Sequence, residues 1–161
     1  MVVILEPAVL YKDELIDNFK KVLYTQDYFY YCGWDCGSEL PKIESREGLY
    51  QYAIIDSDKV VGFFAYEINV YVDVVRNFGV FSFDRGNPVV GKDIFKKMRE
   101  LIKTHHKVEW SVVDGNPVMP YYDRFCNKYG GNKLRFRDAT KDLNGNYIDS
   151  LMYEVINSNR I

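Results

Sequence analysis

The chain has 161 residues, of which 47% are apolar and 27% charged, and its net charge at pH 7 is −2. This length suits a single domain over residues 1–161, and the slight acidity gives no electrostatic attraction to nucleic acid or anionic membranes. The longest apolar run, Val60–Tyr66, is too short to span a bilayer, and no signal-like segment opens the chain. We therefore expect a cytoplasmic protein without nucleic-acid or membrane partners.

Rings and thiols give two further expectations. With 14 Tyr and 10 Phe, the chain is expected to build its core and a pocket wall from aromatic side chains. Cys32, Cys36 and Cys126 are an odd number for a disulfide framework, and two histidines add no zinc-ligand pattern. We expect free thiols and no metal.

The first half of the chain predicts a strand, a helix and a hairpin. Val2–Leu5 is a short apolar strand, and Tyr11–Leu23 has its apolar residues at helical spacing. Tyr24–Leu49, rich in rings and glycine, is expected to be a loop, with a short helix left open as an alternative. Tyr50–Ile55 and Lys59–Tyr71 flank an Asp-Ser-Asp turn and predict a hairpin.

A doubled tetrapeptide marks the second half. After Val72–Phe83, a further antiparallel strand, Gly-Asn-Pro-Val occurs at Gly86–Val89 and again 29 residues later at Gly115–Val118. Asn favours the N-cap of a helix and Pro the first helical position, so each copy predicts a junction between a strand and a helix. This spacing is typical of a βαβ unit with parallel strands, whose ligands collect where strands end and helices begin.

The last elements complete a mixed sheet with helices on its faces. An amphipathic helix follows the first tetrapeptide, and Val108–Val113 is the next strand. Pro117–Tyr129 is a shorter helix ended by two glycines. Leu134–Thr140 and Tyr147–Ile156 form a final hairpin around an Asn-Gly turn.

This order of elements resembles the GNAT superfamily of acyl-CoA N-acyltransferases over nearly the whole chain. In that family the fourth strand runs into a loop of the form Arg/Gln-x-x-Gly-x-Gly/Ala and then a helix. The corresponding segment here is Arg85–Gly91, one residue longer and without the middle glycine. The resemblance implies an α/β fold of GNAT type: a central mixed, mostly antiparallel sheet with splayed parallel strands and helices on both faces.

The resemblance also implies acetyl-CoA as cosubstrate. The diphosphate would bind at the loop, where helix N–H groups and the helix dipole favour anions, whereas the alternative is a tight turn with a good cap. The preceding strand would hold the pantetheine arm through main-chain contacts. The residues that the resemblance assigns to the cosubstrate are Phe81, Phe83, Arg85, Gly86, Asn87, Val90, Gly91, Lys92 and Asn116.

A tyrosine in the second junction helix would protonate the leaving thiolate in such a family member. Here Phe125 lies nearest the usual register and has no proton to donate. Tyr121 or Tyr122, one turn earlier, would then supply the hydroxyl, and packing of these rings on the sheet is the alternative reading.

The general base has several candidates. Glu67 and Asp73, on the central strands, are assigned to catalysis. Asp84 and Glu109 are further candidates, because no spacing rule selects among the four carboxylates. A chain of water molecules is a further alternative.

The acceptor is expected to be an amine, from a small molecule or a peptide. The aromatic segment that includes Tyr28, Tyr30 and Trp34 is predicted to form a wall of its pocket. Edge strands and exposed rings would also permit a homodimer.

Two other functions fit parts of the sequence. A GNAT-shaped binding or accessory protein without transferase activity would explain the altered loop and the missing tyrosine. A P-loop-like nucleotide-binding protein is suggested by Gly86–Asp93, which matches Gly-x4-Gly-Lys, although Asp93 stands where a Ser or Thr would bind Mg²⁺.

Overall fold

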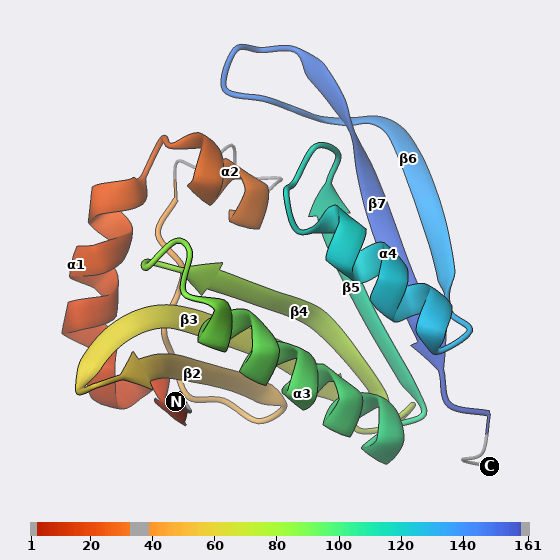
Figure 1. The fold of residues 1–161 in the computed structure, drawn as a ribbon, viewed down its shortest axis with the longest axis horizontal. Coiled ribbons are helices and arrows are strands. Elements are labelled where there is room, and N and C mark those ends of the chain that lie inside the picture. The colour runs from red at the N-terminus through yellow and green to blue at the C-terminus, as the bar shows by residue number, and fades with distance from the viewer. Residues whose placement is uncertain (1–2, 33–38, 159–161) are drawn as a thin grey trace.

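The computed structural model describes residues 3–32 and 39–158, and its strands form one seven-stranded sheet in the order β1-β2-β3-β4-β5-β7-β6 (Figure 1). Only β4 and β5 pair in parallel, and the other neighbours are antiparallel. The predicted mixed sheet is confirmed. The strands are β1 (Ile4–Pro7), β2 (Leu49–Asp56), β3 (Lys59–Asn69), β4 (Val74–Ser82), β5 (Lys107–Val113), β6 (Asn132–Lys141) and β7 (Tyr147–Ile156).

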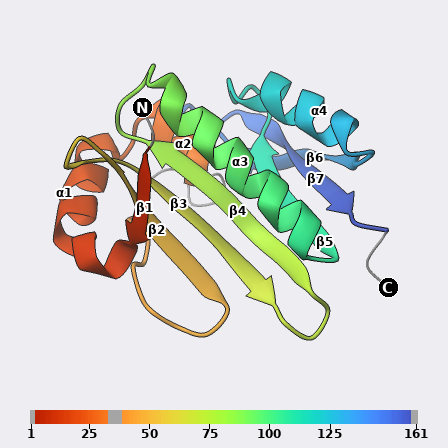
Figure 2. The same ribbon diagram turned by 60° about the horizontal axis from the view of Figure 1, so that its bottom comes forward.

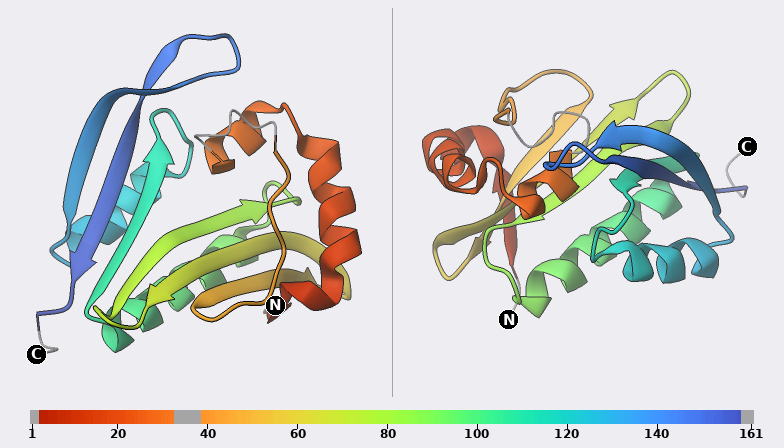
Figure 3. Two further views of the ribbon diagram at one scale, coloured as in Figure 1. Left: turned by 180° about the vertical axis from the view of Figure 1, so that it is seen from behind. Right: turned by 90° about the horizontal axis from the view of Figure 1, so that it is seen from above.

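Helices cover both faces of the sheet, as expected (Figures 2 and 3). α3 (Pro88–Thr104) and α4 (Met119–Lys128) lie on one face, and α1 (Lys12–Val22) and α2 (Gln26–Cys32) on the other. A 3-10 turn, η1 (Ala8–Tyr11), precedes α1. Within the described part of the chain, no helix is both long and apolar enough to cross a bilayer.

α2 is the short helix that was left open as an alternative within Tyr24–Leu49, and residues 39–48 have no helix or strand. Thr25 precedes the helix, and its hydroxyl accepts a hydrogen bond from the Tyr28 amide at 3.3 Å. Such a cap satisfies one of the free N–H groups at a helix start. The short-helix alternative was the correct one.

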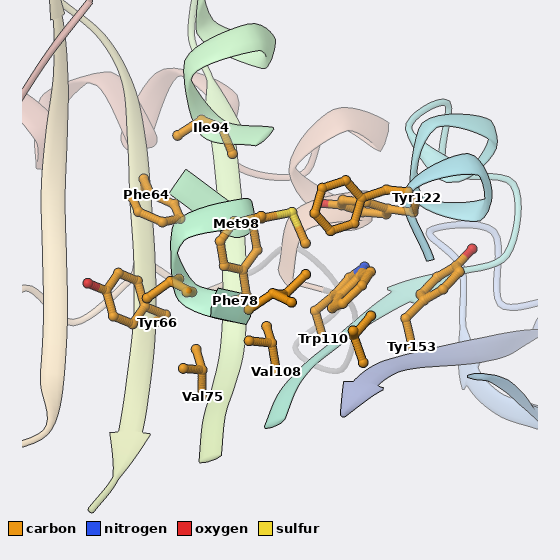
Figure 4. Close-up of a cluster of buried hydrophobic side chains, with 14 of the residues drawn as sticks. Phe64, Tyr66, Val75, Phe78, Ile94, Met98, Val108, Trp110, Tyr122 and Tyr153 are labelled. Carbon is orange, nitrogen blue, oxygen red and sulfur yellow. The ribbon is translucent and has the colours of Figure 1, made fainter. Parts of the chain in front are cut away.

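The core has one part on each face of the sheet, and rings supply much of both. Phe19 of α1 packs against Tyr28 of α2 and Phe63 of β3. On the opposite face, Trp110 stacks parallel to Tyr153 with 5.3 Å between the ring centroids. Figure 4 shows this second part, to which β3, β4, β5, β7, α3 and α4 all contribute.

The two parallel strands separate soon after they meet. β4 and β5 pair only at Val74–Lys107 and Val75–Val108, although the strands have nine and seven residues. Their carboxyl-terminal halves therefore diverge, and backbone groups on these edges are not used by the other strand of the pair. Ligand sites of open α/β sheets lie at such strand ends.

Candidate functional site

A cavity of about 520 Å³ lies between the diverging halves of β4 and β5. We call it the donor-side cavity, because the sequence interpretation expects the acyl donor at the strand ends that line it. Both Gly-Asn-Pro-Val junctions contribute to its wall, together with residues of α2, α3 and α4. The structure thus brings together most of the residues that the sequence nominated: Tyr30, Phe81, Arg85, Gly86, Asn87, Val90, Gly91, Asn116, Tyr121 and Tyr122.

The first junction leaves few amides for a ligand. Asn87 caps α3, and its Oδ1 accepts from the Val89 amide at 3.1 Å, whereas Pro88 has no N–H. The next two residues, Val90 and Gly91, line the cavity. The segment is therefore both a capped turn and a cavity wall, and an anion there would meet the helix N-terminus.

The same junction does not behave as a P-loop. Asp93 Oδ2 accepts a hydrogen bond from the Val3 amide at 3.1 Å, so this carboxylate ties α3 to the start of the chain. The loop follows a central strand of a mostly antiparallel sheet. We therefore abandon the nucleotide-binding alternative.

Two predicted donor contacts are not in the cavity wall. The Phe83 amide donates to the Val61 carbonyl at 2.8 Å, and its ring packs 4.9 Å from that of Phe19, so neither its N–H nor its side chain is available. Lys92 is exposed and does not line the cavity. The structure therefore does not support Phe83 as a contact of the cosubstrate, and the contact of Lys92 stays a prediction.

The two candidate tyrosines have different surroundings. Tyr122 is 5% exposed and lies against Phe95 and Trp110, with its side chain at the cavity wall. Burial raises the pKa of its hydroxyl, so this group stays protonated. Tyr121 is 54% exposed, and the Arg124 guanidinium lies over its ring. Phe125 is buried in the core and does not line the cavity.

A β-bulge in β4 marks the place where the strands part. The register of β4 with β3 shifts between Ala65 and Glu67, and Asn77 has a φ of 53°, in the left-handed region. Non-glycine residues in that region are strained, and bulges are common beside active sites. The sequence interpretation missed this feature, although Asn is among the residues that tolerate such a φ.

A second cavity of about 610 Å³ meets the first at this bulge. We call it the acceptor-side cavity, because its wall includes Tyr28, which the sequence interpretation expects beside the acceptor. The residues that line both cavities are Tyr31, Phe78, Gly79 and Ser111. Space is tight here, because a Cβ added at Gly79 would lie 3.3 Å from the Tyr31 ring. A larger residue at position 79 would therefore press on the Tyr31 ring, which lines both cavities.

The candidate bases are held by partners. Glu67 lines neither cavity, and its carboxylate accepts from Asn77 at 3.2 Å and pairs with Arg46. Glu109 lines the acceptor-side cavity and lies 3.0 Å from both Arg76 and Lys107. Asp84 lines the donor-side cavity.

Asp73 is wrong as a catalytic residue. It precedes β4 at the end where the strands still pair, opposite the cavities. Its Oδ1 lies 2.7 Å from His105 Nδ1, and its Oδ2 accepts from the His106 amide at 2.9 Å. These contacts give it a structural role between α3 and β5.

The predicted acceptor wall is divided between the cavities. Tyr28 lines the acceptor-side cavity, and its hydroxyl donates a hydrogen bond to the Glu39 carbonyl. Tyr30 lines the donor-side cavity, and its carbonyl accepts from Asn116 Nδ2 at 3.4 Å. Trp34 lies outside the described residues. Tyr31, which the sequence did not single out, faces both cavities.

Comparisons with known proteins identify this architecture. No family model matches the sequence, and no curated protein sequence matches it. Solved structures do: a GCN5-related N-acetyltransferase from Brucella melitensis is 20% identical, with a TM-score of 0.64, over 99% of this chain and 77% of that one.

Two further structures carry more specific names. The ribosomal-protein-S18-alanine N-acetyltransferase from Escherichia coli is 15% identical, with a TM-score of 0.56, over 70% of this chain and 71% of that one. A spermidine N-acetyltransferase chimera involving Vibrio cholerae is 16% identical, with a TM-score of 0.55, over 70% and 69%. The aligned part spans 64% of another acetyltransferase chain. The chain has the GNAT fold, and identities this low show the fold alone.

Proposed function

We propose that this protein is an N-acetyltransferase that moves the acetyl group of acetyl-CoA to a primary amine by direct attack. The observation that supports this most is the meeting of two cavities at the β4 bulge, between parallel strands that diverge. A donor in one cavity and an acceptor in the other would then meet where Phe78, Gly79 and Ser111 line both. The GNAT fold of the chain agrees with this arrangement.

The donor-side cavity offers contacts along the length of acetyl-CoA. Arg85 and the amides of Val90 and Gly91 would meet the diphosphate, because charge-assisted contacts and a helix N-terminus favour anions. The free edge of β4 beyond Val75 would hydrogen-bond the pantetheine arm. The thioester would then reach the bulge, where Phe78 and Gly79 line both cavities and their backbone amides are the proposed donors for its carbonyl oxygen.

The reaction needs one nucleophile and one acid. The neutral amine attacks the thioester carbonyl carbon, a C–N bond forms, and the C–S bond breaks. Tyr122 is the proposed proton donor to the leaving sulfur, since burial keeps its hydroxyl protonated at the cavity wall. The extra proton on the new amide nitrogen passes to water or to a carboxylate.

The acceptor would enter through the acceptor-side cavity. That cavity is lined by Tyr28, Tyr31 and Met152 together with polar groups such as Asn77 and Glu109. An amine with an apolar body suits such a wall. The similar proteins named above act on a ribosomal-protein alanine and on spermidine, so both a peptide N-terminus and a polyamine belong in the first panel of acceptors.

The experiment is a transfer assay with mass detection. Acetyl-CoA is incubated with the protein and a panel of peptides, amino acids and polyamines, and both free CoA and the acetylated amine are measured. The proposal predicts equal amounts of the two products for at least one acceptor. CoA release that no acceptor accelerates would contradict direct transfer.

A module that binds the donor without transfer is the second candidate. One observation favours it: Asp27 pairs with Arg85, so the cation nominated for the diphosphate already has a partner. Such a module would bind acetyl-CoA and release no CoA with any amine.

A further inference from the structure

α2 connects the two Gly-Asn-Pro-Val junctions. At its first turn, Asp27 forms an ion pair with Arg85, in the junction between β4 and α3. Further along, the Tyr30 carbonyl accepts from Asn116 Nδ2, in the junction between β5 and α4. Figures 1 and 3 show α2 beside the carboxyl ends of both strands. Both contacts lie at the donor-side cavity, because all four residues line it.

The charges in this cavity do not favour an anion while Asp27 holds Arg85. Among the described lining residues, the charged side chains are Asp27, Asp84 and Arg85, which leaves a net charge of −1. Arg85 is the one cation of this set. Its side chain is 61% exposed and that of Asp27 is 35% exposed, so solvent and ligand can reach the pair.

We propose that Asp27 sets the affinity for the donor by competing with its diphosphate for Arg85, and that displacement of Asp27 frees the first turn of α2. This inference rests on the proposed function. A diphosphate carries more negative charge than a carboxylate and binds a guanidinium through several oxygens, so it displaces Asp27. The displaced carboxylate is then close to an anion and is repelled by it.

The rest of α2 determines what moves. Tyr28 and Phe29 are 1% and 0% exposed, so they hold the middle of the helix in the core. The helix has only seven residues, too few to be stable without its tertiary contacts. Release of Asp27 therefore loosens the first turn.

A double-mutant cycle tests the competition. CoA affinity is measured by calorimetry for the wild type, Asp27→Asn, Arg85→Gln and the double variant. The control is Asp17→Asn, at an exposed position of α1. Asp27→Asn should tighten CoA binding about two- to tenfold, the range expected for a partly exposed ion pair together with the lost repulsion. In the Arg85→Gln background the gain should be clearly smaller, because no guanidinium is left to compete for.

Hydrogen exchange tests the movement without any assay of activity. The proposal predicts faster exchange of the amides of α2 when CoA is added, and no change with pantetheine, which lacks the diphosphate. Asp27→Asn should show faster exchange without ligand, and Asp17→Asn should not.

The outcomes separate this inference from the proposed function. The competition would be overturned if the wild type bound CoA as tightly as Asp27→Asn. It would also be overturned if Asp27→Asn raised CoA affinity equally with Arg85 present and with Arg85→Gln. Either result leaves the acetyltransferase proposal standing. Failure of the wild type and of Asp27→Asn alike to bind CoA would overturn both, since an unpaired Arg85 should still attract the diphosphate.

Discussion

Asn77 Nδ2 donates a hydrogen bond to Glu67 Oε2 at 3.2 Å and so fastens the bulge of β4 to the neighbouring strand β3. The contact holds Asn77 at a φ of 53°, where a residue other than Gly, Asn or Asp is strained. It also gives Glu67 a role, although this carboxylate lines neither cavity. A residue nominated as a base is thus a support for the backbone at the proposed reaction point.

The first prediction concerns this bulge. Asn77→Val should destabilise the fold by about 1–2 kcal/mol, because a β-branched residue resists the left-handed region. It should also lower kcat by about a hundredfold if the bulge presents amides to the thioester carbonyl. Asn77→Gly keeps the backbone geometry and should retain most of the activity. Equal kcat values for the two variants, at matched folded fraction, would show that the bulge has no such role.

Tyr122 gives the second prediction. Tyr122→Phe removes only a hydroxyl for which no hydrogen-bond partner is found among the described residues, so Tm should change little. The loss of a positioned proton donor should lower kcat about a hundredfold while KM for acetyl-CoA stays near its wild-type value. The comparison is Tyr121→Phe, at a ring that is 54% exposed. A larger fall in kcat for Tyr121→Phe would assign the proton donor to the other tyrosine.

Gly91→Ala should separate stability from donor affinity. A Cβ at this position meets no atom within 4 Å, and Ala is a better helix former than Gly by about 0.5–1 kcal/mol. Tm without ligand should therefore rise slightly. The added methyl group stands at the cavity wall near the proposed diphosphate site, so CoA affinity should fall. An unchanged CoA affinity would show that the phosphates bind elsewhere.

The sequence predicted the parts of the fold that depend on local chemistry. The repeated Asn-Pro pairs predicted both junctions. Asn87 caps α3 by accepting from the Val89 amide, whereas Asn116 accepts from the Val118 amide in a turn just before α4, which begins at Met119. Apolar runs predicted the strands and their succession along the chain, but not their order in the sheet. Within Tyr24–Leu49 the short helix could only be left open as an alternative, because the rings of this segment have no clear period and α2 is held by tertiary packing.

The site was predicted less well, for a physical reason. Residues at the junctions are close in sequence to the strand ends that position them, so the sequence could predict that Arg85 and Asn116 lie at this cavity. Asp27 and Tyr31 come from a helix that is distant in sequence, and no local pattern predicts that it lies at the cavity. The alternation of apolar residues along a strand shows which residues face the core, but it does not show at which end two strands diverge. Asp73 was therefore placed near the site, although it lies at the end where β4 and β5 still pair.

The fourth prediction is an acid sensitivity at α4. Asp123 Oδ1 accepts from Lys133 at 2.9 Å and from the Tyr153 hydroxyl at 2.8 Å, and the Lys133 contact is the main cause that lowers the pKa of this carboxyl. In the unfolded chain the pKa is about 3.9. A pKa that is lower in the folded state adds stability above that value, and the stability is lost as the pH falls through the folded pKa.

Asp123→Asn should therefore make Tm less dependent on pH from about pH 4 downward, where the carboxyl group of the unfolded chain takes up a proton before that of the folded protein does. The control is Asp13→Asn, at an exposed residue in the first turn of α1. Parallel curves for the wild type and Asp123→Asn would contradict the role of this pair.

The most direct test of the account is thermal unfolding with acetyl-CoA, CoA, ATP with Mg²⁺, or no ligand. A ligand at a hundred times its Kd stabilises a protein by about 2.7 kcal/mol, which raises Tm by several degrees. The account predicts a rise with acetyl-CoA and with CoA, a smaller rise in Arg85→Gln, and no comparable rise with ATP. Wild-type protein whose Tm is unchanged by saturating acetyl-CoA, or is raised by ATP alone, would contradict a donor site between β4 and β5.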